Sequence, residues 1–350
     1  MFEEIELTDR EQLILQAVVH TYITTAQPVG SRSVVKRYDL RLSPATVRNV
    51  MADLEDSGFL QQLHTSSGRV PTDRGYRYYV DYLMGVQELT LGERNRIEME
   101  LSQRIEDADE ILRQTCHLLA LVTHHTGIVE APGDENAQLR QIELAPLSPS
   151  RLAIMLADNY GRVRTALVTP RAALPKERLS SLSQFLNDHL RGTPMSEVPS
   201  RLQARANTLL DEQRGLAEQA LELLGAVPIH RPGQLFLEGA TQLFEQPEFQ
   251  DVSRARAVFC LLDEQERLLD LLRRGVAHGD PRRTRVLIGS ETAGDGLEEI
   301  SLVASPYCVK DRLAGVLGVL GPRRMPYPKL TAIVEYTAGM VGRFLTRLAG

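Results

Sequence analysis

The segment between Ser43 and Pro71 constrains the fold of this chain more than any other. Its first pair, Ser-Pro, suits a helix start because a serine side chain caps free amide groups and proline fits the first helical position. Apolar residues then recur every three to four positions, which predicts a short helix ending at Gly58. Two short strands, 59–63 and 69–71, follow around a Ser-Ser-Gly turn. A capped helix followed by a small hairpin is typical of a DNA recognition helix and its wing.

Helix signals on both sides extend this segment into a larger N-terminal unit. The run Thr8–Glu11 has the capping-box pattern that opens a helix. A second short helix is expected to start at Ser31, and Thr72 is placed to cap a further helix after the hairpin. Together these elements predict a winged helix-turn-helix domain over residues 1–88.

The charges along the predicted recognition helix favour DNA at its N-terminal end. The acidic residues Asp53, Glu55 and Asp56 crowd its C-terminal half, whereas an isolated helix would prefer acids at its N-terminus. This inversion keeps carboxylates away from the end that would approach phosphates. Arg48 can pair with guanine and Asn49 with adenine in the major groove. An ordinary, well-capped surface helix is the simpler alternative, and the attached hairpin makes it less favoured.

The candidate DNA contacts divide into base readers and backbone anchors. Thr46, Arg48 and Asn49 are the expected base readers, and Ala45 allows close approach to the base edges. Hydroxyls and cations nearby suit phosphate oxygens, and these candidates are Ser31, Arg32, Ser43, His64, Ser66, Ser67 and Arg69. Arg69 could also enter a minor groove. For each wing residue taken singly, a plain solvated hairpin is an equally good interpretation.

Length and charge set limits on the rest of the molecule. The 350 residues exceed the usual size of one core, so two or three domains are expected. A net charge of −6 argues against a protein that coats nucleic acid without sequence preference. The stretch 28–77 differs, because it holds eight basic and five acidic residues. DNA contact is therefore expected at one end of an otherwise acidic chain.

Other classes of site find little support. The three cysteines lie far apart, so neither a disulfide framework nor a zinc knuckle is expected. His117, His124 and His125 lack acidic or cysteine partners at metal-ligand spacing. The glycine-rich run 315–321 lacks the strand–turn–helix context of a nucleotide site and is better explained as a packed hairpin strand. We expect no catalytic residue, no metal and no cofactor.

The location of the protein is also constrained by sequence. The N-terminus is too acidic for a signal peptide, and no apolar run approaches the roughly 20 residues that a membrane span needs. A soluble, cytoplasmic protein without a membrane segment is expected.

Beyond the N-terminal unit the pattern is mixed α/β. One long amphipathic helix is expected over 91–125, which at 1.5 Å per residue would reach roughly 45–50 Å and could space domains or pair with a second copy. Strands are expected at 141–147, 151–156, 163–169, 285–288, 300–309 and 315–320, and helices at 176–190, 201–224, 264–274 and 329–348. The weak periodicity between 191 and 262 suggests an insertion within a strand-rich domain.

Residues 7–84 closely resemble the heat-inducible transcription repressor family (HrcA) of bacteria. The motifs that carry the resemblance are Pro28–Arg32, Leu42–Asn49, Met51–Glu55, His64–Thr72 and Gly75–Asp81, and Gly315–Tyr327 is similar to the family's C-terminal signature. The resemblance therefore covers both ends of the chain, while 191–262 matches the family by position and length only.

The resemblance implies an α+β multidomain protein with an N-terminal winged helix-turn-helix, a GAF-like α/β domain and an inserted dimerisation segment. The implied domains are 1–88 for DNA binding, 89–190 with 263–350 for the GAF-like domain and its long linker helix, and 191–262 for the insertion. It further implies a homodimer that binds double-stranded DNA at an inverted-repeat operator (the CIRCE element) and represses chaperone genes. A GroEL-type chaperonin is the implied partner, which supports repression until heat diverts it to unfolded proteins.

Two other functions remain open from sequence. In the first, a winged-helix regulator senses a small molecule through its GAF-like domain, and a small ligand would then change its DNA affinity. In the second, an enzyme or scaffold uses the winged helix for protein contact. That protein would show no preference for an inverted repeat over scrambled duplex.

Overall fold

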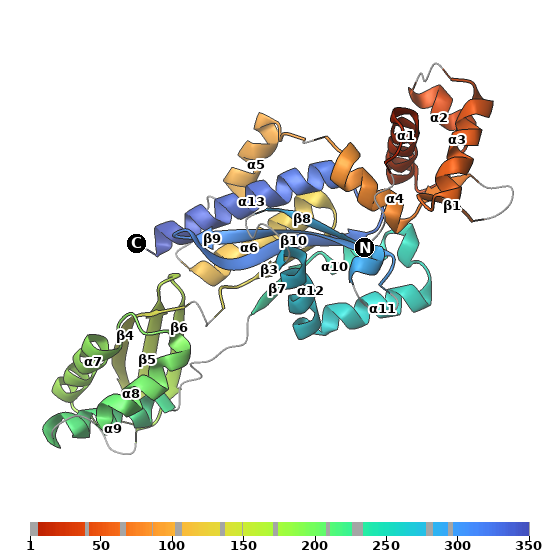
Figure 1. Cartoon of the computed structure of the whole chain (residues 1–350). Helices are drawn as coiled ribbons and strands as arrows, with labels where there is room; N and C mark the ends of the chain where they lie inside the picture. Colours follow the sequence, from red (N-terminus) through yellow and green to blue (C-terminus); the bar gives the residue numbers. More distant parts are fainter. Residues whose placement is uncertain are drawn as a thin grey trace.

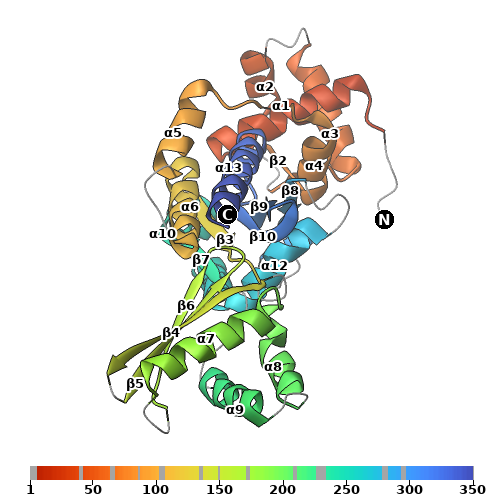
Figure 2. The ribbon, with the colours of Figure 1, turned by 90° about the vertical axis from the view of Figure 1, so that its left-hand side faces the viewer.

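The computed structural model of the chain has three parts in a row (Figure 1). A helical N-terminal unit and a three-stranded unit lie at opposite ends of a central five-stranded sheet, as Figure 2 also shows. The structure describes residues 6–38, 42–63, 68–85, 87–101, 107–133, 137–148, 150–170, 174–207, 211–225, 234–277, 283–292 and 297–349.

The N-terminal unit consists of three helices and a hairpin. Its elements are α1 (Asp9–Thr25), α2 (Ser31–Tyr38), α3 (Pro44–Asp56), β1 (Leu60–Gln62) and β2 (Arg69–Pro71). Helix α1 starts at the expected capping box, in which Thr8 and Glu11 each bond the other's backbone amide. Ile14, Val18 and Val47 are fully buried where the helices meet. The apolar periodicity that predicted these helices therefore forms their shared core.

The segment after the hairpin corrects one expectation. Helix α4 (Asp73–Tyr78) continues as a π-helix (Tyr79–Leu83) and leads to α5 (Leu91–Leu101) and α6 (Ala108–Thr123). The prediction of one helix over 91–125 is wrong, because Asp107 has the extended conformation (φ −118°, ψ 130°) of an N-cap and starts α6 afresh. The apolar positions of α5 and α6 continue one helical period, which concealed the break. No strut of 45–50 Å forms.

The central sheet is entirely antiparallel, with strand order β7-β3-β10-β9-β8. Its strands are β3 (Thr126–Glu130), β7 (Leu235–Glu238), β8 (Arg285–Ile288), β9 (Ile300–Val309) and β10 (Arg312–Pro322). The helices and 3₁₀ turns around it are α10 (Ala240–Phe244), Pro247–Phe249, α11 (Val252–Asp263), α12 (Gln265–Ala277), Gly289–Thr292 and α13 (Tyr327–Leu348).

Helices cover both faces of this sheet. Along β9, Leu302 and Ala304 share a core with the apolar residues of α11 and α12, whereas Val303 and Tyr307 share one with α6 and α13. This alternation explains why β9 is apolar at nearly every position, since a strand buried on both faces has no polar side. The glycine-rich run expected to pack tightly lies in β10, where a Cβ on Gly318 would come within 2.4 Å of the Val303 carbonyl oxygen.

The third part is an insertion between β3 and β7. It contains the antiparallel sheet β4-β5-β6 and helices that cover one of its faces. Its elements are β4 (Leu139–Ser148), β5 (Arg151–Asp158), β6 (Val163–Val168), α7 (Lys176–Leu190), the 3₁₀ turn Met195–Glu197, α8 (Val198–Ala206) and α9 (Asp211–Gly225). The predicted insertion boundaries of 191 and 262 do not match this topology. Strand periodicity found β4–β6, but periodicity does not say which sheet a strand joins.

The two strands that frame the insertion were not predicted at all. Strands β3 and β7 have only five and four residues. Every residue of β3 is buried, so it lacks the alternation that marks a half-exposed strand. Among the residues that the structure describes, no helix combines the length and apolar character needed to cross a membrane.

Candidate nucleic-acid interface

Helix α3 begins with the predicted cap. The Ser43 side-chain oxygen accepts a hydrogen bond of 3.0 Å from the Thr46 amide, and Pro44 occupies the first turn. The Ser43 and Thr46 hydroxyls also lie 2.9 Å apart, within hydrogen-bond distance. Both candidate DNA contacts therefore take part in fixing the start of α3. The free amides at this end, with the positive end of the helix dipole, favour an anionic ligand.

We predict that Ser43→Ala destabilises α3 locally by about 1 kcal/mol, the usual cost of losing such a cap. Hydrogen exchange of the α3 amides in the full chain would measure this loss. Ser43→Asn is the matched variant, because asparagine caps helices as well as serine does. It should restore slow exchange and most of the DNA affinity. Exchange as fast as that of Ser43→Ala would contradict the capping role, whereas slow exchange combined with affinity as weak as that of Ser43→Ala would show that the hydroxyl itself contacts DNA.

The outer face of α3 presents the expected base readers. Ala45, Arg48 and Asn49 are exposed, whereas Val47 and Met51 point into the core of the unit. Within the described part of the chain, the side chains of Arg48 and Asn49 form no hydrogen bond or ion pair. A guanidinium and a carboxamide thus stand side by side on a rigid helix with their donors available. These are the groups that read guanine and adenine edges.

Helix α2 adds positive charge next to this face. Ser31 is half-buried in its first turn, and Arg32 is exposed. Lys36 and Arg37, about one turn later, are exposed as well. Neither was among the residues predicted to contact DNA. For Lys36 the available signal was its spacing from Arg32, since residues four positions apart lie on one side of a helix.

The hairpin is fastened to α3 by one carboxylate. Glu55 accepts a hydrogen bond of 2.7 Å from Arg69 Nε on β2 and another of 3.1 Å from the Gln62 amide on β1. The Arg69 backbone also pairs with Val29 in both directions, at 2.8 and 2.9 Å. The Arg69 side chain is 15% exposed and lies at the base of the hairpin. It therefore holds the hairpin against α3, and its predicted phosphate contact stays a prediction. His64, Ser66 and Ser67 lie outside the described residues.

We predict that Arg69→Ala weakens DNA binding less than loss of Arg48 and makes the salt dependence of binding shallower, because one phosphate contact disappears. Glu55→Gln is the matched variant, since it loosens the hairpin and leaves the Arg69 charge in place. Its salt slope should equal that of the unmodified protein. Titrations at several salt concentrations measure both slopes. An unchanged slope for Arg69→Ala would leave this residue with its structural role alone.

Of the histidines near α6, His117 and His124 are exposed, and the buried His125 is explained by packing. His125 is buried, and its Nδ1 lies 2.6 Å from the Thr123 carbonyl oxygen. Burial lowers the pKa of this imidazole and favours its neutral form. Within the described ranges, no group of three or more His, Cys, Asp or Glu side chains is arranged to hold a metal ion.

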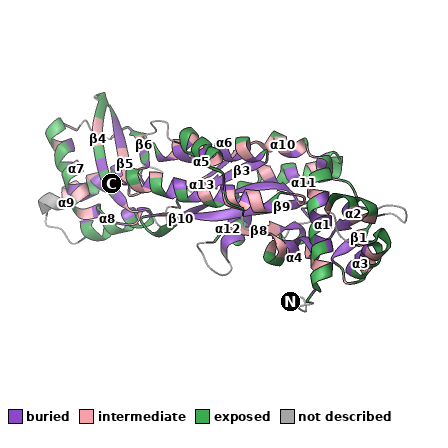
Figure 3. Ribbon diagram, turned by 90° about the horizontal axis from the view of Figure 1, so that it is seen from above, coloured by how far each residue is buried: buried purple, intermediate pink, exposed green. Residues whose placement is uncertain are grey.

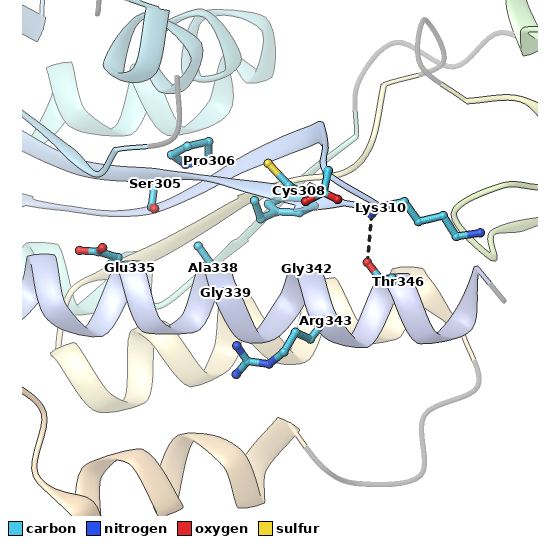
Figure 4. A pocket seen from close by; sticks show the side chains of 12 residues that line it. Ser305, Pro306, Cys308, Lys310, Glu335, Ala338, Gly339, Gly342, Arg343 and Thr346 are labelled. Atoms are coloured by element: carbon cyan, nitrogen blue, oxygen red, sulfur yellow. Dashed lines mark hydrogen bonds between the residues drawn. The ribbon is translucent and has the colours of Figure 1, made fainter. Parts of the chain in front are cut away.

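A cavity of about 630 Å³ lies between β9 and α13 (Figure 4). Its charged side chains do not converge on a common point: Lys310 reaches the Ala349 carbonyl at 3.1 Å, and Arg343 points to the far side of α13. The Lys310 amide donates to the Thr346 hydroxyl at 3.1 Å. The cavity therefore lacks the focused polar group that fixes a small ligand.

Comparison with known proteins identifies the family. The family model described as the HrcA protein C-terminal domain matches residues 109–331. Heat-inducible transcription repressor HrcA of Geobacter sulfurreducens is 41% identical and aligns over 97% of this chain and 98% of its own length. The repressor of the same name from Pelotomaculum thermopropionicum is 36% identical, over 98% of each chain.

A solved structure shares the fold. A crystal structure titled as a hypothetical protein superposes with a TM-score of 0.68, at 22% identity, and covers 98% of this chain and all of the other. It supports the arrangement of the three parts and says nothing of function. The sequence matches support the resemblance seen in the motifs at both ends, and they fall in a family of transcription repressors, not enzymes. The chain therefore belongs to the HrcA family of heat-inducible transcription repressors.

Proposed function

We propose that this protein represses transcription of heat-shock genes by binding duplex DNA through the N-terminal unit, which acts as a winged helix-turn-helix. The observation that carries the proposal is the outer face of α3, where Arg48 and Asn49 are exposed and have no partner among the described residues. The nearby cations of α2 supply phosphate contacts. Family membership supports the class of function, and the exposed donors of this face support DNA binding by α3.

We further propose that the active form is a homodimer on an inverted-repeat operator. The inserted sheet supports this, because α7 covers one face of it and the other face carries exposed apolar side chains. Exposed residues of β4 in this sheet are green in Figure 3. On that open face Val163 and Leu167 are each 61% exposed, and Leu167 lies opposite Ala153 on the next strand. A second copy of the same face is the occupant that symmetry favours. A two-fold axis along the length of the molecule would put both N-terminal units at the same end, as an inverted repeat requires.

The heat response is proposed from the family resemblance. A GroEL-type chaperonin in the cytoplasm would support the folded repressor, and heat would divert that chaperonin to other unfolded proteins. The decisive experiment is footprinting of the full-length protein on DNA upstream of chaperone operons, with and without chaperonin, at two temperatures. Protection of the inverted repeat that is lost on heating and restored by chaperonin is the expected result. Equal binding to scrambled duplex would refute the proposal.

A small-molecule sensor is the second candidate, and it would use the cavity between β9 and α13, whose volume suits a small ligand although its charged side chains do not converge. In this version the central sheet and its helices act as a GAF-like ligand domain. Thermal-shift screening followed by DNA titration would separate the two candidates. A ligand that changes operator affinity without chaperonin would support the sensor.

A further inference from the structure

Two sequence motifs from opposite ends of the chain meet in space. The motif at 75–81 lies on α4 and the π-helix, and the motif at 315–327 leads from β10 into α13. Their side chains interlock where the N-terminal unit rests on the central sheet, next to β8 and the turn that follows it (Figure 1). We call this contact the joint, and define it by Asp73, Arg77, Glu291, Arg323 and Arg324. None of these residues belongs to the proposed DNA-binding surface of α3, so DNA contact does not explain why they are held together.

One ion-pair cluster of the joint centres on Asp73, at the start of α4. Its two carboxylate oxygens accept hydrogen bonds from Arg323 Nη1 at 2.7 Å and from the Ser290 amide at 2.9 Å. Arg323 also pairs with Glu299 at 3.3 Å, and its side chain is 17% exposed. Burial tends to raise the pKa of Asp73, but the bonds from Ser290 and Arg323 outweigh burial and lower it. Both partners are therefore charged and held in one geometry.

A second cluster consists of hydrogen bonds and ion pairs made by Arg77 and Arg324 across the joint. Arg77 Nε donates to Glu291 at 2.8 Å, and its Nη2 donates to the Val286 carbonyl at 2.6 Å. Arg324 reaches back to the Ile23 carbonyl near the end of α1 at 3.0 Å, while its Nε pairs with Glu248 at 2.7 Å. The central unit thus binds the N-terminal unit at two places, α1 and α4. Because the hydrogen bonds at these two places are directional, they resist rotation of the N-terminal unit as well as its separation from the central unit.

An aromatic contact completes the joint. Tyr76 of α4 and Tyr327 of α13 meet edge to face, with ring centroids 6.0 Å apart. Both side chains are fully buried, and the Tyr327 hydroxyl lies 3.0 Å from the Ser301 hydroxyl. The contact excludes water beside the ion pairs, which strengthens them relative to pairs on an open surface.

The joint leaves α3 free. Every contact above comes from α1, α4 or the core, and the outer residues Ala45, Arg48 and Asn49 remain exposed while the unit is docked. The docked state is therefore compatible with DNA binding and does not mask the recognition surface. Its effect is to fix where that surface points.

We propose that the joint sets the half-site spacing that the dimer accepts. This inference rests on the proposed binding of a dimer to an inverted repeat. Adding one base pair between half-sites moves them apart by about 3.4 Å and rotates one relative to the other by about 35°. A rigidly held pair of recognition helices cannot follow that change, so simultaneous engagement is lost. Directional ion pairs hold such an angle better than an apolar contact that can slide.

The test compares the full-length protein with the double variant Asp73→Asn/Arg323→Gln, which removes both charges together. Arg77→Gln, which breaks the second cluster, is the milder variant. Arg267→Gln is the control matched in charge to Arg77→Gln, because it breaks an exposed pair with Glu264 at the start of α12, outside the joint. Each protein is titrated with a single half-site and with inverted repeats whose centre is shortened or lengthened by one or two base pairs.

The unmodified protein and the control should lose about tenfold or more in affinity when the spacing changes by one base pair, through lost simultaneous engagement. For the joint variants, the same one-base-pair change should lower affinity by less than about threefold. Their affinity for a single half-site should be unchanged. If affinity depends on half-site spacing in the joint variants as it does in the unmodified protein, the proposal is overturned. It is also overturned if the joint variants lose affinity for a single half-site, because the joint would then only support folding. If the unmodified protein binds the repeat but tolerates every spacing, the joint does not set spacing. If the unmodified protein does not bind the repeat at all, the proposed function itself has failed.

Discussion

Leu167→Asp should convert the protein to a monomer and lower its affinity for the inverted repeat by about 10²–10⁴-fold, the usual gain from linking two binding events. Leu167 is 61% exposed on the open face of the inserted sheet, and Val163 lies on the same face of that strand. A carboxylate there would be buried without a partner in a symmetric interface formed by this face.

Ser180→Asp is the control for this prediction. Ser180 is exposed on α7, which covers the opposite side of the same unit, so the added charge is equal and the fold context is shared. Sedimentation and DNA titration of the same samples measure oligomeric state and affinity. A Leu167→Asp protein that stays dimeric would show that another surface dimerises. A monomer with full affinity would show that pairing is dispensable.

Arg48→Ala should weaken operator binding by about 1–3 kcal/mol and leave the fold intact, because a side chain that reads guanine bidentately contributes that much. Arg48 is exposed and packs against nothing that the core needs. The loss should be largest for the cognate sequence and small for scrambled duplex, since a base contact carries specificity whereas a phosphate contact acts on all sequences.

Arg96→Ala is the matched control, because Arg96 is exposed on α5 and its removal changes the net charge equally. Mobility-shift titrations of cognate and scrambled duplex measure both effects. Equal affinity of Arg48→Ala and the unmodified protein would remove α3 as the recognition helix. An equal loss on both duplexes would reassign Arg48 to the phosphate backbone.

The local elements of the N-terminal unit could be predicted because their signals are short-range. Thr8, Ser43 and Thr72 each cap the helix that their sequence context predicts. The strand at 285–288 and the helix at 176–190 likewise have their predicted bounds. Capping and periodicity act over a few residues, so one sequence is enough to reveal them.

What could not be predicted depends on contacts between distant residues. The break at Asp107 is set by the way α5 and α6 fold onto the core, while their apolar period runs on. The pairing of Arg69 with Glu55 brings together residues on α3 and β2 that the sequence shows only as a basic and an acidic side chain. The joint is the extreme case, since Asp73 and Arg323 are 250 positions apart. Local patterns carry no information about such partners.

The position of the insertion also affects the order in which the chain can fold. Strand β3 pairs with β10 through Val129 and Leu317, and the whole inserted unit is synthesised between them. At ordinary rates of translation, β10 leaves the ribosome about 10–40 s after β3. During that time β3 lacks its long-range partner β10, although α6, the helix that packs on it, has already been made, and a strand with an unpaired edge is prone to aggregate. A newly made chain therefore has an incomplete central sheet for several seconds and is prone to aggregate during that time. This consequence of the topology gives the proposed dependence on a chaperonin a physical basis.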